Sequence, residues 1–332
     1  MGGCYERSAV YAHRESRCTQ DRSGSEARIR KFFSSGKPEL LIAALLAYES
    51  EGRKTGFFKC LMDYQRQSEA EREQKDYEIE SKLEICLTPL DGQEEPTLTD
   101  ILDALEFPPT KGARFIKDPV NVQSTGENSF FGDDNDERFV VISKGGNWYL
   151  KEKGKAEHYS FGIPGEQLVM KRRETRAPTD PLKVAETIMS KYADGTTSYK
   201  GAIRKEKADM YLLNTTTGRM YGVTASDARC GERRQLQLEV EYAGFIKGFA
   251  TDTENERSIV EDIAAINRHI LLMHNGASIK SWRINFLPTS ERKFDFVAGK
   301  KRKEIPAEQY ADEFAGFLRT AQAVSLKAVA RK

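Results

Sequence analysis

The fold of this chain is decided by one stretch of sequence, Tyr77-Glu78-Ile79-Glu80-Ser81-Lys82-Leu83-Glu84-Ile85-Cys86-Leu87. With the two-residue period of a strand, one face carries the apolar side chains of Ile79, Leu83, Ile85 and Leu87. The opposite face carries the charged side chains of Glu78, Glu80, Lys82 and Glu84. Such a strand either lies at a surface exposed to water or separates an apolar core from an ionic interior.

A second stretch of the same kind lies far downstream, Gln235-Leu236-Gln237-Leu238-Glu239-Val240-Glu241-Tyr242. Apolar and polar side chains alternate through it as they do in the first stretch. Each stretch contains a Glu-x-Glu motif, and the chain between the two is predicted to form strands rich in Lys and Arg. The pair argues against an ordinary surface strand, because two acidic strands bracket a run of basic ones.

The order Glu78-x-Glu80-x-Lys82, basic strands and Glu239-x-Glu241 resembles the CYTH, or triphosphate tunnel metalloenzyme, superfamily. Its members include class IV adenylate cyclases, thiamine triphosphatases, inorganic triphosphatases and fungal-type RNA triphosphatases. The resemblance covers roughly residues 75–275. It implies an α+β fold, in which an antiparallel β-barrel (the triphosphate tunnel) has helices packed outside it and helical extensions at both ends of the chain.

Four regions follow from this interpretation. Residues 1–35 are polar and lack apolar periodicity, so a flexible arm is expected there. Residues 36–74 are expected to form an N-terminal helical extension, and 75–275 the tunnel domain. Residues 276–332 are expected to form a C-terminal extension made of a hairpin and a helix.

Composition limits the class of protein. The 332 residues include 52 basic and 51 acidic ones, so the formal net charge is +1 and any electrostatic attraction must be local. No apolar run approaches the roughly 20 residues that a membrane-spanning helix needs. The five cysteines are scattered and odd in number, which favours a reducing, cytoplasmic location over a disulfide framework.

Turns divide the predicted tunnel domain into strands with helices between them, a spacing that favours a closed barrel. The predicted strands are 138–143, 148–153, 168–176, 199–213, 219–225 and 235–242. Helices are predicted after Thr97, at 181–192, from a Ser258-x-x-Glu261 capping box, and at 306–329. Residues 110–137 are predicted to be irregular, and 279–287 with 293–297 to form a hairpin.

A short segment within that hairpin, residues 290–294 (Ser-Glu-Arg-Lys-Phe), echoes the opening strand. It lacks the second glutamate of that strand. We therefore expect it to have no role in the site.

Charges of both signs inside a barrel are costly unless a ligand completes their pairing. Carboxylates on two strands can hold a hard divalent cation such as Mg2+ or Mn2+. With the resemblance, this assigns the metal to Glu78, Glu80, Glu239 and Glu241, with Glu174 as a further ligand. Glu78, Glu80 and Lys82 are the predicted catalytic residues, at a site where the metal orients or activates water.

The basic strands would then neutralise a polyanion. Several cations from separate strands suit a linear triphosphate, because Arg and Lys bind its oxygens. The predicted phosphate-binding residues are Lys82, Lys151, Lys153, Arg172, Arg204, Lys205 and Arg219. Sequence alone does not decide which of Arg204 and Lys205 faces the interior.

Two departures from the family pattern bear on substrate choice and on catalytic competence. An Arg-x-Arg strand is expected after the first turn, but Arg138–Lys144 carries its basic residues only at its ends. Arg176 stands where an acidic residue is expected.

The sequence thus predicts a metal-dependent triphosphatase acting on inorganic triphosphate, a nucleoside triphosphate or thiamine triphosphate. A class IV-type adenylate cyclase is one alternative, and a non-catalytic module that binds polyphosphate or a nucleotide is another. The expected partner is a small triphosphate and not a membrane. Nucleic acid is disfavoured, although an RNA 5′-triphosphate stays open, and the terminal helices offer a surface for a protein partner.

Overall fold

The computed structural model describes residues 77–91, 94–107, 113–118, 122–132, 138–144, 147–179, 198–246 and 255–289, and the single positions Arg28, Lys31, Ala43, Ala44, Ala47, Phe57, Phe249, Arg292, Lys293 and Phe296. The helices predicted at 181–192 and 306–329 lie outside these residues. So do the arm and the N-terminal extension, apart from those single positions.

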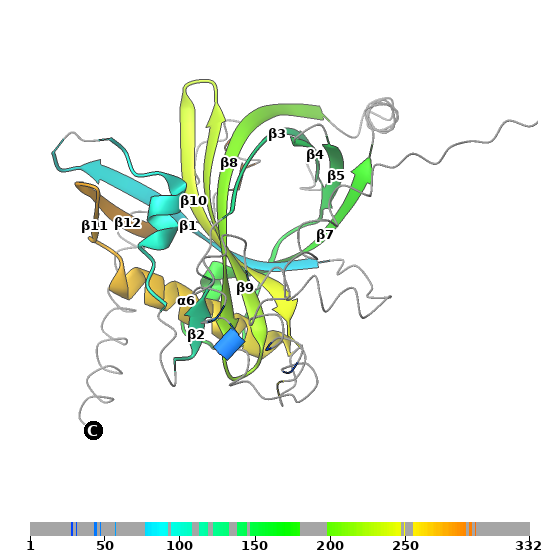
Figure 1. The fold of residues 1–332 in the computed structure, drawn as a ribbon. Coiled ribbons are helices and arrows are strands. Elements are labelled where there is room, and N and C mark those ends of the chain that lie inside the picture. The colour runs from blue at the N-terminus through cyan, green and yellow to red at the C-terminus, as the bar shows by residue number, and fades with distance from the viewer. Residues whose placement is uncertain are drawn as a thin grey trace, which may run out of the picture.

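Eight of the described strands close into a ring. They are β1 (Tyr77–Pro89), β10 (Arg233–Phe245), β9 (Arg219–Cys230), β8 (Ser198–Asn214), β3 (Val122–Gly132), β4 (Arg138–Lys144), β5 (Asn147–Lys153) and β7 (Val169–Thr179). Each pairs antiparallel with the next in this order, and β7 pairs back onto β1 with Arg172 opposite Glu78. Figure 1 shows this ring of curled strands almost end-on. The antiparallel, curled sheet that the resemblance implied is confirmed.

β1 belongs to the ring only in its first half. Residues 77–81 pair with β7 and residues 80–84 with β10, whereas residues 83–89 pair with β12 (Trp282–Pro288). β12 forms a hairpin with the short β11 (Ser278–Ile279). Figure 1 shows this hairpin beside the ring, where β1 leaves it. The remaining short strands, β2 (Phe115–Lys117) and β6 (Glu157–His158), pair with β8 and β7.

Few helices accompany the sheet in the described part of the chain. α4 (Leu98–Asp103) begins at the predicted Thr97, whose side chain and that of Asp100 form a capping box. α6 (Glu256–Met273) begins earlier than predicted, because the Asn255 side chain accepts a hydrogen bond from the backbone N–H of Ser258. The Ser258 capping box was therefore wrong. A single 3-10 turn, η2 (Glu166–Leu168), precedes β7.

The apolar core lies between the outer side of the ring and the helices. The isoleucine stripe predicted for α6, Ile259, Ile263, Ile266 and Ile270, is buried. It belongs to one cluster with Leu83 of β1, Leu238 of β10 and the helix α4. Burying these side chains fixes which face of each strand points outward, so the alternate, charged face points into the ring.

Two local predictions were wrong. The stretch predicted to be irregular contains β2 and β3. β3 was missed because the middle of its sequence, VQSTGENSFFG, is a run of seven residues without an apolar side chain, so no alternation marks it as a strand. In the stretch predicted as a strand after β12, Lys293 and Phe296 are helical, and the Phe296 N–H donates to the Arg292 carbonyl at 3.0 Å.

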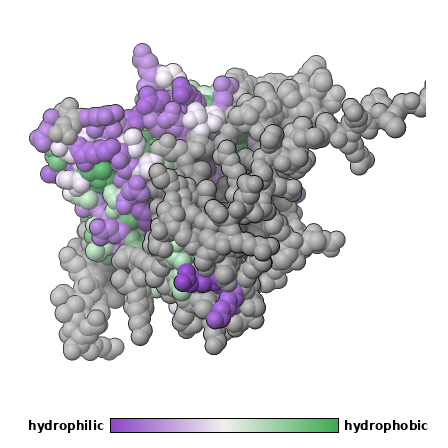
Figure 2. Space-filling model, in the orientation of Figure 1, coloured by the Kyte–Doolittle hydropathy of each residue, from purple (hydrophilic) through white to green (hydrophobic). Residues whose placement is uncertain are grey.

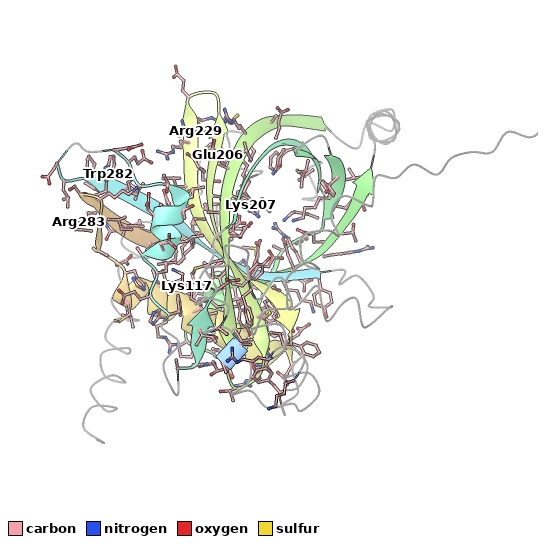
Figure 3. All side chains as sticks on the ribbon, in the orientation of Figure 1. Lys117, Glu206, Lys207, Arg229, Trp282 and Arg283 are labelled. Atoms are coloured by element: carbon pink, nitrogen blue, oxygen red, sulfur yellow. The ribbon has the colours of Figure 1, made fainter. Side chains whose placement is uncertain are left out.

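The outer surface of the described strands is largely hydrophilic in the view of Figure 2. Alternation along β8 sends Glu206 to that outer side and Lys207 into the ring (Figure 3). Among the described helices, none is both long and apolar enough to span a membrane.

Candidate functional site

A cavity of about 430 Å³ lies inside the ring. The strands β1, β3, β4, β5, β7, β8, β9 and β10 all contribute lining residues, as does the segment after β12. The charged lining residues are Glu78, Glu80, Lys82, Lys151, Lys153, Arg172, Lys205, Lys207, Asp209, Glu239, Glu241, Arg292 and Lys293. Eight of these are basic and five acidic, so the cavity carries a surplus of three formal positive charges in a chain of net charge +1.

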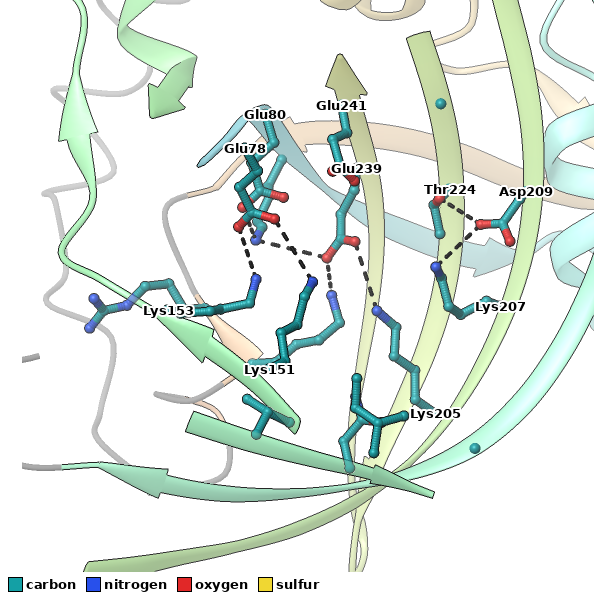
Figure 4. A pocket seen from close by; sticks show the side chains of 18 of the residues that line it. Glu78, Glu80, Lys151, Lys153, Lys205, Lys207, Asp209, Thr224, Glu239 and Glu241 are labelled. Carbon is teal, nitrogen blue, oxygen red and sulfur yellow. Dashed lines mark hydrogen bonds and ion pairs between the residues drawn. The ribbon is translucent and has the colours of Figure 1, made fainter. Parts of the chain in front are cut away.

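The two Glu-x-Glu motifs lie side by side in the wall of this cavity. β1 and β10 are paired so that Glu80 is opposite Glu241 and Lys82 is opposite Glu239. Figure 4 shows the four glutamates gathered above the lysines of the other strands. Like charges directly opposite each other destabilise a sheet, so this register is favourable only with cations close by.

Arg172 of β7 is the cation that joins the two acids of β1. Its Nη2 lies 2.7 Å from Glu80 Oε1, and its Nε donates to Glu78 Oε1. Lys82 Nζ lies 2.7 Å from the same Glu80 oxygen. All four side chains are at most about 5% exposed, so these charges are held by one another and not by bulk water.

Lys151 and Lys153 of β5 connect Glu78 with Glu174 of β7. Lys153 Nζ lies 2.9 Å from Glu78 and 2.7 Å from Glu174. Lys151 contacts Glu174 and lies 3.9 Å from Glu78. Glu174 is thus part of the charge network, although it does not line the cavity itself.

The surroundings shift the pKa values of Glu78 and Glu241 in opposite directions. Burial raises the pKa of Glu78, but the charges of Lys153, Lys151 and Arg172 outweigh it and hold that pKa well below its usual value. Burial also raises the pKa of Glu241, where the negative charge of Glu78 adds to it and the pKa reaches about 7. One carboxyl of the four is therefore partly protonated near neutral pH.

Glu239 is surrounded by ammonium groups from three elements. Lys205 of β8 lies 3.8 Å away and Lys82 of β1 lies 3.9 Å away. Burial raises the pKa of Glu239, but Lys205, Lys293 and Lys82 lower it well below its usual value. Burial lowers the pKa of Lys205 well below its usual value, only partly offset by Glu239.

Lys293 is a site residue that the sequence prediction excluded. Its Nζ donates to Glu239 and lies 2.9 Å from the Gln237 side-chain oxygen. Two neighbouring contacts hold its segment: the Thr289 N–H donates to the Lys82 carbonyl at 3.2 Å, and Phe296 is buried with Phe130 and Val140. The expectation that residues 290–294 have no role was therefore wrong. The echo of the opening strand was the only signal in the sequence.

A second missed group lies on β8 and β9. Asp209 Oδ1 accepts a hydrogen bond from Thr224 Oγ1 at 2.6 Å and lies 3.4 Å from Lys207 Nζ. All three residues line the cavity. Figure 4 shows this group on the opposite side of Glu239 from the Glu78 and Lys153 pair.

Two predicted phosphate-binding residues are absent from the lining. Arg204 points to the outer side, where its side chain is 71% exposed and lies 3.3 Å from Glu206. Arg219 is buried 3.3 Å from Asp262 of α6. On β8 the inward residue is therefore Lys205, and the cavity gathers Lys82, Lys151, Lys153, Arg172 and Lys205 from the predicted set.

The residues present fit a hard divalent cation by their donor chemistry. The four glutamates of β1 and β10 line one cavity, where burial, together with the crowding of negative charge from Glu78 and Glu80, raises the pKa of Glu241. A cation between such carboxylates would relieve that crowding. Across the described ranges, no three His, Cys, Asp or Glu side chains already stand together as a metal site, because the acids are paired with Lys and Arg.

Several solved structures are similar to this one in fold. A putative adenylyl cyclase from Hippeastrum with a dominant triphosphatase activity is 14% identical, with 68% of this chain and 98% of that chain covered and a TM-score of 0.37. An RNA triphosphatase from S. pombe is 11% identical, with 64% and 89% covered and a TM-score of 0.27. The capping enzyme triphosphatase of Mimivirus is 7% identical, with 63% and 96% covered and a TM-score of 0.31.

The eight-stranded ring encloses the charged cavity, which we call the tunnel below. No family profile matches the chain, and no curated protein matches it in sequence. What the tunnel does is therefore argued from its own side chains.

Proposed function

We propose that this protein hydrolyses a triphosphate in its tunnel with the help of a divalent cation, Mg2+ or Mn2+. The observation that carries the proposal is the pairing of β1 with β10, which places Glu78, Glu80, Glu239 and Glu241 together in a cavity with surplus positive charge. Acids can hold a metal, and the surplus cations attract an anion. A site for a metal bound to a polyphosphate needs both the acidic groups and the basic ones.

The roles divide between the two kinds of charge. Glu78, Glu80, Glu239 and Glu241, with Glu174 next to them, would hold the cation. When bound, such a cation polarises phosphoryl oxygens and can lower the pKa of a water molecule. Lys82, Lys151, Lys153, Arg172 and Lys205 would bind the phosphates, and Lys293 joins them from the segment after β12.

Binding would exchange partners within the tunnel. In the structure, ammonium and guanidinium groups neutralise the glutamates, as Lys293 does for Glu239 and Arg172 for Glu78 and Glu80. With a cation held by these carboxylates, Lys293 and Arg172 would be released to bind the phosphate oxygens. Fixed cations that are already desolvated stabilise the charge that develops as the terminal phosphoryl group is transferred.

Phosphate release tests the proposal. Tripolyphosphate, ATP and thiamine triphosphate would each be incubated with Mg2+ or Mn2+, and the products separated by ion exchange to distinguish hydrolysis from cyclisation. Glu239→Gln should lose nearly all metal-dependent release, whereas Glu232→Gln, an exposed acid in the turn before β10, should behave like the wild type. Cyclic nucleotide and diphosphate as the products would replace this proposal with the cyclase.

One observation favours a second function, metal-free binding of a polyphosphate without turnover. Glu78, Glu80, Glu174 and Glu239 are each paired with Lys or Arg, and the described residues form no ready metal site. Calorimetry with tripolyphosphate in the presence of EDTA would show binding at full affinity in that case. Affinity that depends on Mg2+ or Mn2+ and disappears in Glu239→Gln would support hydrolysis instead.

A further inference from the structure

The tunnel contains one group that the proposed phosphate and metal chemistry does not use. Asp209 and Tyr211 on β8 and Gly222 and Thr224 on β9 all line the cavity. They are directly paired, Asp209 opposite Thr224 and Tyr211 opposite Gly222. This group is a continuous part of one wall, built by two neighbouring strands.

Asp209 and Thr224 both offer hydrogen-bond acceptors to a ligand. The Thr224 hydroxyl donates its hydrogen to Asp209 Oδ1 at 2.6 Å, so its oxygen has only acceptor capacity left. An ionised carboxylate is also purely an acceptor. Lys207 Nζ lies 3.4 Å from the same Asp209 oxygen, so the acceptors left for a ligand are Asp209 Oδ2 and the Thr224 oxygen. Two such acceptors attract a ligand group that brings hydrogen atoms, such as a pair of hydroxyls.

The position of this group along the wall suits the part of a substrate that follows the phosphates. Glu239 of β10 is opposite Thr224, and Thr224 is opposite Asp209. Neighbouring strands are about 4.8 Å apart, so Asp209 lies about two strand spacings, roughly 10 Å, from the acid-bearing strand β10. This distance is short enough for a substrate whose phosphates lie beside Glu239 to place its organic end at Asp209.

The glycine opposite Tyr211 keeps space beside the aromatic ring. A Cβ atom at Gly222 would lie 3.6 Å from Tyr211 Cε1, in van der Waals contact with that edge of the ring. Tyr211 and Gly222 both line the cavity, and position 222 places no side chain against this edge of the ring. An aromatic edge and two acceptors are a combination that sugar rings can use.

We propose that Asp209, Thr224 and Tyr211 form a subsite for the ribose of a free nucleoside triphosphate, with Asp209 and Thr224 accepting from its 2′ and 3′ hydroxyls. This rests on the proposed function, because the phosphates must occupy the cationic part of the same tunnel. A 5′-triphosphate end of RNA fits less well, because its 3′ oxygen is esterified and cannot donate. Inorganic triphosphate has nothing to place at this subsite.

The test compares ATP with 2′,3′-dideoxy-ATP as substrates, with Mg2+ or Mn2+. For the wild type, kcat/KM should be at least about tenfold higher for ATP, mostly through KM, as expected for hydrogen bonds to a charged group. Thr224→Val and Asp209→Ala should both bring this ratio toward one. Glu206→Gln, on the outer side of β8, is the matched control and should keep the wild-type ratio.

Equal kcat/KM values for the two nucleotides in the wild type would overturn the subsite, as would ratios left unchanged by both variants. If no triphosphate is turned over, a calorimetric comparison of a non-hydrolysable ATP analogue with its dideoxy form separates the two proposals. Tighter binding of the hydroxylated analogue, lost in Thr224→Val, would keep the subsite while hydrolysis fails. Equal binding of both analogues would overturn the subsite.

Discussion

Two regions of this protein bury acidic side chains against arginines, and they differ in what surrounds the charges. Outside the ring, Asp262 of α6 is 1% exposed and accepts hydrogen bonds from Tyr221 at 2.7 Å and from Asn214 at 2.9 and 3.0 Å. Arg114 and Arg219 complete its shell at 2.5 and 3.3 Å. Inside the ring, Glu78 and Glu80 share Arg172, but a cavity of about 430 Å³ lies beside them.

The difference separates a structural role from a binding role. Asp262 has as many donors as its two oxygens can use, and it ties α6 to the turn between β8 and β9. Its neighbour Tyr221 has its pKa raised well above the usual value by burial and by Asp262, so it stays a donor. The tunnel acids have space beside them and cations that can change partners. The pairing of acids with basic side chains is complete around Asp262, whereas in the tunnel it leaves room for a ligand.

The largest effect should come from an acid of the tunnel. Glu80→Gln removes the charge that Lys82 and Arg172 both contact at 2.7 Å. We expect kcat/KM for the hydrolysed triphosphate to fall by about a thousandfold, as when a group that organises transition-state charge is lost. Unfolding temperature should change little, because Arg172 keeps Glu78 and Lys82 keeps Glu239 as a counter-charge. Glu157→Gln, an exposed acid on β6, serves as the control for phosphate release.

Glu80→Gln could instead unfold the protein and leave the activity of the folded fraction intact. That result would contradict the binding role of the tunnel acids. It would make the tunnel charges structural, like those around Asp262.

The next effect is on stability. Asp262→Asn removes the carboxylate charge that the Arg219 guanidinium, which is 4% exposed, contacts at 3.3 Å. Breaking a buried ion pair in this way costs about 3–5 kcal/mol of unfolding free energy, which urea denaturation can measure. Activity per folded molecule should be retained. Glu261→Gln, an exposed neighbour on α6, should change the stability by less than about 0.5 kcal/mol.

Much of this contrast was predictable, and what was missed has a common cause. The Glu-x-Glu strands were found because alternation is a local signal: apolar faces must be buried, so their charged faces must point the other way. The inward choice of Lys205 over Arg204 is ambiguous locally, because apolar side chains are buried on both faces of β8: Ile203 on the face of Lys205 and Met210 on the face of Arg204. Arg219 opens β9 next to the turn, where it meets a helix about forty residues further along the chain.

Lys293 shows more clearly that local sequence patterns cannot predict contacts between distant segments. Nothing in the sequence around Lys293 says that its side chain lines the barrel interior; the contacts of Thr289 with Lys82 and of Phe296 with Phe130 decide it. Asp209 is similar, because its role depends on Thr224 of the neighbouring strand. Contacts between distant segments, and not propensities, complete this site.

A moderate effect is expected from Lys293. Lys293→Met should raise KM for a triphosphate about tenfold, the loss typical of one hydrogen bond to a charged group, with a smaller change in kcat. Steady-state kinetics at saturating metal would measure it. Lys280→Met, which removes an exposed lysine paired with Asp100, is the matched control. An unchanged KM would mean that Lys293 neutralises Glu239 only in the empty tunnel.

The smallest effect distinguishes the two regions by pH. Burial and the charge of Glu78, with contributions from Glu80 and Glu174 and opposed by Lys151, raise the pKa of Glu241 to about 7. A carboxyl whose pKa is higher in the folded state favours folding below its unfolded pKa and loses that contribution as the pH rises through 7. Glutamine does not titrate. Glu241→Gln should therefore be more stable than the wild type at pH 8. At pH 5 this advantage should be smaller.

We expect this gain to be about 1 kcal/mol, because the Glu241 side chain is exposed to the cavity and its charge is partly screened. Urea denaturation with EDTA at pH 5 and pH 8 would measure it. Added Mg2+ or Mn2+ should reverse the order at pH 8, since only the wild type keeps the full set of carboxylates for binding. A gain at pH 5 instead, or none at either pH, would mean that the tunnel acids are as well satisfied as Asp262 and are not poised for a cation.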